Sequence, residues 1–192
     1  MSETVVMCTY FDQAGPANTE RALELAFRRA RELNITHVLV PSTTGATGLK
    51  AAFLRRDEQV VVVSHSAGFV KPNQQEMPEP VRQQIIAAGA TVITCQHALG
   101  GVGRAVRRKL ATYQLDEIIA FTLRTMCQGV KVACELALMA ADCGAIPVGP
   151  EIVSLGGTGR GVDTALVLRA ANAQDLFDLR VLEVICKPRC WE

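Results

Sequence analysis

The amino-acid sequence predicts an α/β fold, with three α/β/α layers around a mostly parallel mixed sheet. Short apolar runs alternate with amphipathic helical segments along most of the chain, which is the pattern of parallel strands joined by crossover helices. Gln59–Ser64 contains four consecutive valines, as expected for a strand that is buried on both faces. The tail from Glu151 onward is richer in strands, which predicts one or two antiparallel strands at an edge of the sheet.

The first third of the chain predicts strands and helices in alternation. Gly15 and Pro16 mark a turn at 12–18, and Asn18 is suited to cap the helix that follows. That helix has apolar side chains at helical spacing, namely Leu23, Ala26, Phe27, Ala30 and Leu33. The elements expected here are a strand at Val5–Tyr10, this helix, a strand at Thr36–Val40, a loop at Ser42–Gly48, a helix to about Arg55 and the strand Gln59–Ser64.

The middle of the chain contains a long loop, and further helices and strands follow it. Gly68–Glu79 contains Pro72, Pro78 and several polar residues, and it is long enough to fold over a neighbouring segment. The later elements expected are helices at Val81–Ala88, Ala105–Ala111, Glu117–Leu123 and Gly129–Asp142, and strands at Thr91–Cys95, Glu151–Leu155, Thr164–Arg169 and Arg180–Cys186. With no repeat or linker in the sequence, we expect one domain over residues 1–192.

Composition argues against several classes of partner. The 192 residues are 49% apolar, which is enough for one sizeable core, and the net charge is +1 with only 20% charged residues. We therefore expect no binding to nucleic acid or to a membrane surface. No apolar run is long enough for a transmembrane helix. Glu3 stands where a signal peptide would carry a basic residue, so we expect no export.

The seven cysteines favour a reducing compartment, which indicates a cytoplasmic protein. Their number is odd and they are spread through apolar segments, unlike a disulfide framework. Cys186 and Cys190 are separated by three residues, but no second pair or nearby histidine completes a metal site. We interpret the cysteines as core or incidental thiols and expect no metal site.

The first candidate site is the loop between the second strand and its helix. In α/β folds, ligands bind beyond the carboxyl ends of the strands, where the strand-to-helix loops lie. Hydroxyl groups, a glycine and a helix N-terminus together offer donors that suit a phosphate group. The residues concerned are Ser42, Thr43, Thr44, Gly45, Ala46 and Thr47. A capped turn without a ligand is the alternative, and the absence of a GxxxxGK[ST] motif argues against nucleotide hydrolysis.

A glycine-rich loop after the strand Glu151–Leu155 is the second candidate. Its glycines would let a ligand approach the backbone, Arg160 could pair with an anion, and Asp163 could accept from a hydroxyl or a ring N–H. The loop residues concerned are Gly156, Gly157, Thr158, Gly159, Arg160 and Asp163. The spacing is not GxGxxG, so a flexible connection without a ligand remains the alternative.

Two further loops carry single side chains of interest. His65 follows the valine-rich strand and could exchange a proton, contact a phosphate or bond a cofactor ring, or simply cap the local backbone. His37 and His97 are weaker candidates for a role in a binding or catalytic site. Arg124 lies between two helices, with Lys131 at the start of the second, where a cation is explained by a bound anion or by solvation. The basic run Arg104–Lys109 is interpreted as the solvated face of a helix.

Several stretches across nearly the whole chain resemble one known family. They are Gly15–Glu20, Gly45–Thr47, Val63–Phe69, Thr122–Arg124, Gln128–Ala133, Gly156–Gly161, Asp163–Ala165 and Phe177–Arg180. In these stretches the chain resembles stand-alone pyruvate-kinase-C-terminal-like proteins of archaea and bacteria. The strand, the Ser42–Thr47 loop and the helix after it also resemble the phosphate-binding loop in the C-terminal domain of pyruvate kinase, the domain that binds the allosteric sugar bisphosphate.

The resemblance implies an α/β/α fold with a mixed sheet and a phosphorylated ligand, for which FMN is the favoured candidate. It implies that the phosphate lies on the Ser42–Thr47 loop and the ring near His65 or Gly156–Gly161. Where the family pattern has a pair of histidines, Ser66 follows His65 here. Kinase activity is not implied, because the catalytic residues of pyruvate kinase belong to its barrel domain.

Three functional hypotheses follow. The leading one is an FMN-binding protein that acts as a small flavin-dependent oxidoreductase, in which the cofactor supplies the redox chemistry. The alternative is a non-catalytic regulatory module that binds a sugar phosphate or a nucleotide. A third is a transferase or isomerase of a phosphorylated metabolite, with His65 as catalytic acid–base. The apolar helices and the tail with Trp191 permit a homo-oligomer.

Overall fold

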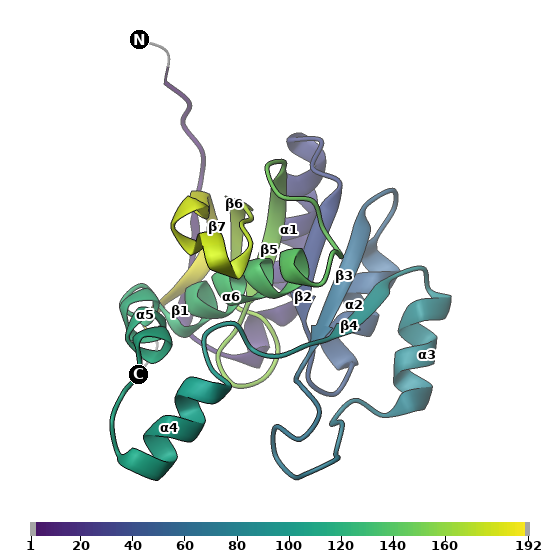
Figure 1. Ribbon diagram of the computed structural model, residues 1–192. Helices are drawn as coiled ribbons and strands as arrows, with labels where there is room; N and C mark the ends of the chain where they lie inside the picture. Colours follow the sequence, from purple (N-terminus) through teal and green to yellow (C-terminus); the bar gives the residue numbers. More distant parts are fainter. Residues whose placement is uncertain (1–2, 191–192) are drawn as a thin grey trace.

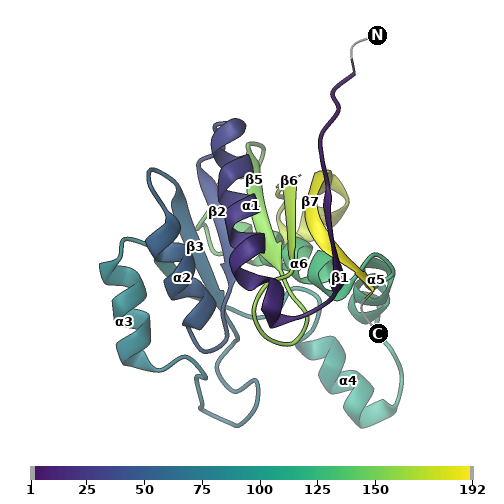
Figure 2. The same ribbon diagram turned by 180° about the vertical axis from the view of Figure 1, so that it is seen from behind.

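The computed structural model, which describes residues 3–190, has a seven-stranded mixed sheet covered by helices on both faces (Figures 1 and 2). The sheet order is β1-β7-β6-β5-β2-β3-β4. The strands are β1 (Thr9–Gln13), β2 (His37–Pro41), β3 (Gln59–Ser64), β4 (Thr91–Thr94), β5 (Glu151–Gly156), β6 (Thr164–Arg169) and β7 (Arg180–Cys190). The predicted α/β class and three-layer arrangement are confirmed.

Helices follow most of the strands. The α-helices are α1 (Thr19–Glu32), α2 (Ala46–Leu54), α3 (Glu79–Ala87), α4 (Val102–Leu110), α5 (Leu115–Arg124) and α6 (Gln128–Asp142), and the short 3-10 helices are η1 (Pro16–Asn18) and η2 (Ala173–Asp178). The helices α1 and α2 cover one face of the sheet and α6 covers the other, with α5 outside α6 (Figures 1 and 2).

Strand β3 shows why the central strands have continuous apolar runs in their sequence. Val60 and Val62 face the core under α1 and α2, whereas Val61 and Val63 face the core under α6. Since side chains alternate between the two faces of a strand, a strand covered on both sides must be apolar at every position. The prediction that β3 is buried on both faces is confirmed.

The antiparallel part of the sheet differs from the prediction. Only β6 runs against its neighbours, β5 and β7, and it lies three strands in from the edge. The expected strand at Val5–Tyr10 is also wrong, because Val5 and Met7 are 89% and 90% exposed and β1 begins at Thr9. Pairing explains both findings: β1 lies parallel to the second half of β7, from Thr9 opposite Cys186 onward. This pairing extends β7 beyond its predicted end and makes β1 the edge strand.

The cysteines occupy three kinds of environment. Cys127, Cys134 and Cys186 are buried, Cys8 and Cys95 are half-buried, and the remaining two are exposed, namely Cys143 and Cys190. All seven are free thiols. Burial raises the pKa of the Cys134 and Cys186 thiols to about 12, so both stay protonated at neutral pH. Trp191, which the sequence placed in a tail suited to an oligomer contact, lies outside the described residues.

Candidate functional site

The loops that the sequence singled out meet at one edge of the sheet. Because β2, β3, β4 and β5 are parallel, the segments that follow them emerge together, at the lower end of the sheet in Figure 1. A cavity of about 620 Å³ lies there. Its lining comes from the β1–α1 turn, the β2–α2 loop, the β3–α3 loop, the start of α6 and the β5–β6 loop. The expectation that ligand-binding loops gather at this edge fits the geometry.

The β2–α2 segment Ser42–Thr47, here called the hydroxyl loop, ends in the first turn of α2. The helix begins at Ala46, so Ala46 and Thr47 belong to α2 and not to the loop. Gly45 precedes it with φ +94°, and a Cβ there would come within 2.3 Å of a Val81 methyl. Glycine is therefore required both for the turn and for its packing against α3. In the first turn of α2, Ala46 and Thr47 line the cavity, and amides at a helix N-terminus lack acceptors within the helix, which makes them potential anion donors.

The hydroxyl groups of this loop have different roles. The buried Ser42 hydroxyl accepts a hydrogen bond of 3.1 Å from the Gly48 amide, so it is already used within the protein. Thr43 Oγ1 lies 3.4 Å from His65 Nε2. Thr44 is exposed and lines the cavity. Of these three hydroxyl residues, Thr44 is the one best placed to donate to a ligand.

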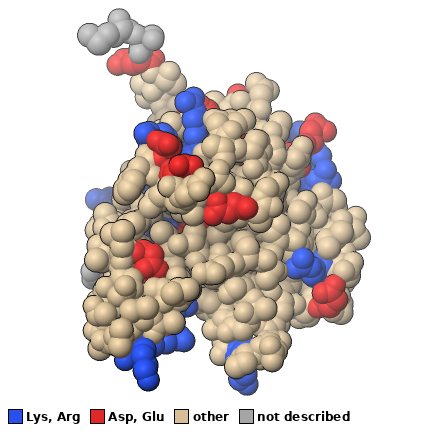
Figure 3. Space-filling view, in the orientation of Figure 1, with Lys and Arg blue, Asp and Glu red and all other residues tan. Residues whose placement is uncertain are grey.

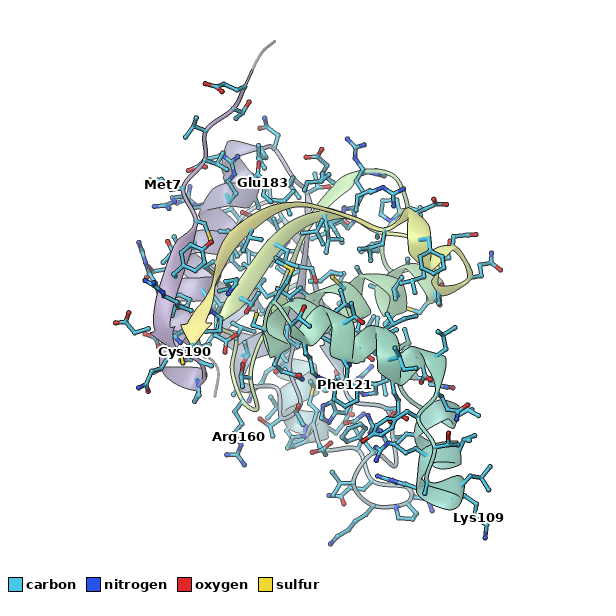
Figure 4. The ribbon with its side chains drawn as sticks, turned by 90° about the vertical axis from the view of Figure 1, so that its left-hand side faces the viewer. Met7, Lys109, Phe121, Arg160, Glu183 and Cys190 are labelled. Carbon is cyan, nitrogen blue, oxygen red and sulfur yellow. The ribbon has the colours of Figure 1, made fainter. Side chains whose placement is uncertain are left out.

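The β5–β6 loop contributes backbone more than side chains. Gly157, Gly159, Arg160 and Gly161 line the cavity, and Figure 4 shows Arg160 extending outward from the loop. Thr158 does not line it, and its buried hydroxyl has no hydrogen-bond partner among residues 3–190. This loop therefore presents mainly backbone to the cavity, with the Arg160 side chain extending outward beside it.

Two predicted residues of this loop hold the fold together. Asp163 is fully buried. Its carboxylate accepts a hydrogen bond from the Gly15 amide at 2.9 Å and another from the Thr164 hydroxyl at 2.9 Å. It ties the β5–β6 hairpin to the β1–α1 turn and does not line the cavity. Gly156 packs against α6, where a Cβ would lie 1.9 Å from the Gly129 carbonyl oxygen. Both residues are thus engaged in contacts within the protein, and their predicted ligand contacts stay a prediction.

His65 is oriented by a carboxylate. Its Nδ1 lies 2.7 Å from Glu76 Oε2, contributed by the β3–α3 loop, while Nε2 faces Thr43 and the cavity. A carboxylate on one ring nitrogen fixes which nitrogen carries the proton, and it leaves the other available for chemistry. The loop backbone is held by Gln75, whose amide donates to the His65 carbonyl at 3.0 Å. This geometry is compatible with an acid–base role for His65, which stays a prediction.

A second, smaller cavity lies beside the first and shares Ser42, Thr43, His65 and Gln128 with it. Its volume is about 170 Å³. We call it the basic pocket, defined by the charged and imidazole side chains His65, His97, Arg104, Arg124, Lys131 and Glu135. Its aromatic wall is Phe69, whose ring centroid lies 4.2 Å from that of His65 and 5.0 Å from that of His97.

The floor of the basic pocket is a buried ion pair. The Lys131 ammonium donates to Glu135 Oε2, and the Leu99 amide donates to Glu135 Oε1 at 2.9 Å. Burial raises the pKa of the Glu135 carboxyl, but hydrogen bonds from His97 and Lys131 outweigh it and hold that pKa well below its ordinary value. Burial lowers the pKa of Lys131, which Glu135 partly offsets. Glu135 is therefore a carboxylate at neutral pH.

Sequence reasoning missed part of this pocket. Glu76 and Glu135 were not singled out, and Arg104 was assigned to a solvated helix face, whereas its guanidinium lies 4.9 Å from the Phe69 ring centroid. His97 supplies a second imidazole, 5.3 Å from His65 between ring centroids, although Ser66 stands where the family pattern has one. One signal was available: Lys131 and Glu135 are four residues apart in a helix with a wide apolar stripe. Two opposite charges at that spacing in an apolar helix indicate a buried ion pair.

The fold and the clustered loops define an α/β domain with a cavity at the carboxyl ends of its parallel strands, and the comparisons identify its family. The chain matches the family model of the pyruvate kinase alpha/beta domain over residues 20–168. It belongs to that family.

Solved structures that the chain matches include a pyruvate kinase from Cryptosporidium parvum and the Cryptosporidium parvum pyruvate kinase in complex with ADP. Each is 14% identical with a TM-score of 0.44, and the match covers 82% of this chain. The same matches cover 23% and 24% of those enzymes. The chain therefore spans about a quarter of their length.

Within residues 3–190, no three His, Cys, Asp or Glu side chains group closely enough to hold a metal ion. No helix in that range combines the length and apolar character needed to cross a bilayer. Figure 3 shows charged side chains scattered among uncharged ones, with no broad patch of one sign on the face in view.

Proposed function

We propose that this protein binds a phosphorylated small molecule, with FMN as the favoured ligand, and acts as a small flavin-dependent oxidoreductase. One observation carries the proposal: a single cavity joins the hydroxyl loop at the N-terminus of α2 to the His65–Glu76 pair. A helix N-terminus favours a phosphate group, and a cavity of about 620 Å³ lies within the usual range for small-molecule sites. A phosphate donor set and an acid–base group thus face the same bound molecule.

The residues present fit a phosphorylated ligand that carries a ring. The Thr44 hydroxyl and the first-turn amides of α2 would hold the phosphate, and Arg160 would approach it from the rim. The bare backbone at Gly157 and Gly161 lets a flat ring lie close to the loop, because no side chain stands between them. Bound FMN would supply the redox chemistry that no side chain of the site provides.

His65 would serve the proton steps at the ring. Its Nδ1 is held by Glu76, so Nε2 is the nitrogen that would donate to or accept from the ligand. Thr43, at 3.4 Å from Nε2, would help to keep the imidazole plane in place. The assignment makes His65 the residue whose loss affects turnover more than phosphate binding.

The test begins with the ultraviolet–visible spectrum of freshly purified protein, followed by titration with FMN and with riboflavin. Co-purified flavin, or binding that requires the phosphate, is the expected result. A colourless protein that binds neither compound would contradict the FMN proposal. In that case, titration with sugar phosphates and nucleotides would test a non-catalytic regulatory module, which predicts ligand binding without turnover.

A further inference from the structure

The basic pocket contains more positive charge than its carboxylate neutralises. Its one carboxylate, Glu135, is already engaged with Lys131 and the Leu99 amide, and the His65 ring is paired with Glu76 of the larger cavity. His97 Nδ1 also lies 3.7 Å from Glu135. These contacts account for the lysine and the imidazoles at the pocket, and they leave the arginines to be explained.

Arg104 and Arg124 both line the pocket without an acidic partner. Arg104 packs over the Phe69 ring, and Arg124 donates to the neutral Gln128 side chain at 2.6 Å. Among residues 3–190, no carboxylate lies within 4.0 Å of either guanidinium. Two guanidinium groups that converge on one cavity repel each other unless an anion lies between them.

The positive charges of Arg104 and Arg124 act on Lys131 at the floor of the pocket. Besides burial, which is the main cause, the positive charges of Arg124 and Arg104 lower the pKa of the Lys131 ammonium. Three cations therefore share one small space although they come from α4, α5 and α6. Such an arrangement costs free energy in the absence of a ligand, and it strengthens the binding of an oxyanion.

His97 supplies an independent observation. Its Nε2 is inaccessible to solvent and has no hydrogen-bond partner among the described residues. Buried polar atoms are rarely left without a partner, so an orphaned nitrogen beside a cavity indicates a group that the protein itself does not provide. An oxygen acceptor in the basic pocket would satisfy Nε2 when that nitrogen carries the proton.

We propose that the basic pocket is a second binding site, which takes the carboxylate or phosphate group of a small anionic molecule. Arg104 and Arg124 hold the oxygens, and Lys131 adds charge from below. The volume of about 170 Å³ equals that of roughly six water molecules, which suits a compact oxyanion. The His65 ring borders both cavities, so a molecule held here lies against whatever occupies the larger one. The second site does not depend on FMN being the ligand of the larger cavity.

Histidine side-chain NMR tests this site directly, with inorganic phosphate and acetate as separate probes. His97 and His65 line the pocket, whereas His37 begins β2 at the opposite end of the sheet and serves as an internal control. Saturable changes in the His97 resonance, with His37 unchanged, are expected for at least one probe. Response to phosphate alone identifies a phosphate site, and response to acetate alone identifies a carboxylate site.

Matched variants assign the binding to the arginines. We expect Arg104→Gln and Arg124→Gln each to weaken the response of His97 at least 10-fold. Arg108→Gln removes the same charge from an exposed position on α4, and it should change the affinity less than twofold. No His97 response to either probe, or an equal loss in all three variants, would overturn the proposal. A clear His97 response in a protein that does not bind FMN would uphold the second site and contradict the proposed function.

Discussion

The hydroxyl loop and the basic pocket adjoin at one edge of the sheet, yet they are built in opposite ways. The hydroxyl loop is one continuous segment, and its donors are mainly backbone amides at the start of α2. The basic pocket takes its charged side chains from the β4–α4 loop, α4, α5 and α6. The first is fixed by local chain geometry, whereas the second exists only when distant elements pack correctly. Variants should therefore act differently in the two regions.

Loss of the Glu135 carboxylate should have the largest effect on stability. Glu135→Gln leaves the buried Lys131 ammonium without a counter-charge, and breaking a buried ion pair costs about 3 kcal/mol or more. Urea unfolding followed by circular dichroism measures the loss. Glu24→Gln breaks an exposed pair with Arg21 on α1, and it should change the free energy of unfolding by less than about 0.5 kcal/mol. Equal effects in both variants would show that the basic pocket has no special energetic role.

The contribution of Glu135 should also depend on pH. Its carboxyl has a lower pKa in the folded protein, about 2, than its ordinary value of 4.5. A group of this kind stabilises the fold above pH 4.5, and the stabilisation disappears as the pH falls toward 2. The difference in unfolding free energy between wild type and Glu135→Gln should therefore shrink over that window. A difference that stays constant from pH 6 to pH 3 would contradict the assignment.

Disruption of the close backbone contact between Gly156 and Gly129 should have the next largest effect on stability. Gly156→Ala places a methyl group 1.9 Å from the Gly129 carbonyl oxygen, and overpacking of this kind costs about 2–3 kcal/mol. Gly159 is the matched position in the same loop, where nothing lies within 4 Å of an added Cβ. Because its φ is +76°, Gly159→Ala should cost about 1 kcal/mol. Thermal unfolding distinguishes the two, and the reverse order would contradict the packing described between β5 and α6.

Substitution of Ser42 should have the smallest effect on stability. It also distinguishes a structural role from a ligand-binding role within the hydroxyl loop. The Ser42 hydroxyl caps the start of α2 through the Gly48 amide, so Ser42→Ala should cost about 1 kcal/mol of stability. Since that hydroxyl is already used, FMN affinity should change less than threefold. Parallel unfolding and FMN titrations measure the two quantities. A large loss of affinity with unchanged stability would mean that the Ser42 hydroxyl faces the ligand.

The sequence predicted those features that depend on local pattern. The continuous valines of β3 predicted burial on both faces, and the hydroxyl residues before α2 predicted a donor-rich loop at the carboxyl ends of the parallel strands. The apolar run before β1 was misleading, because strand formation there depends on pairing with β7. No local pattern indicates that a segment near the N-terminus will pair with the last strand.

Side chains that meet only through the fold were harder to predict. Arg104 lies in a basic run that resembles any solvated helix face, and its role depends on contact with Phe69, 35 positions earlier in the chain. Asp163 looked like a ligand-binding carboxylate, since acidic residues in glycine-rich loops often are. Its actual partner, the Gly15 amide, is 148 residues away. In both cases the decisive contact is between elements that are distant in sequence.

The most direct test of the account is the affinity of Thr44→Ala for FMN and for riboflavin. If the phosphate lies on the hydroxyl loop, loss of this hydroxyl should weaken FMN binding about 10- to 100-fold, as for a lost charge-assisted hydrogen bond of about 1.5–3 kcal/mol. Riboflavin binding should change less than twofold, and Thr112→Ala, at an exposed position after α4, should affect neither. Equal weakening of both flavins would contradict the placement of the phosphate at the N-terminus of α2.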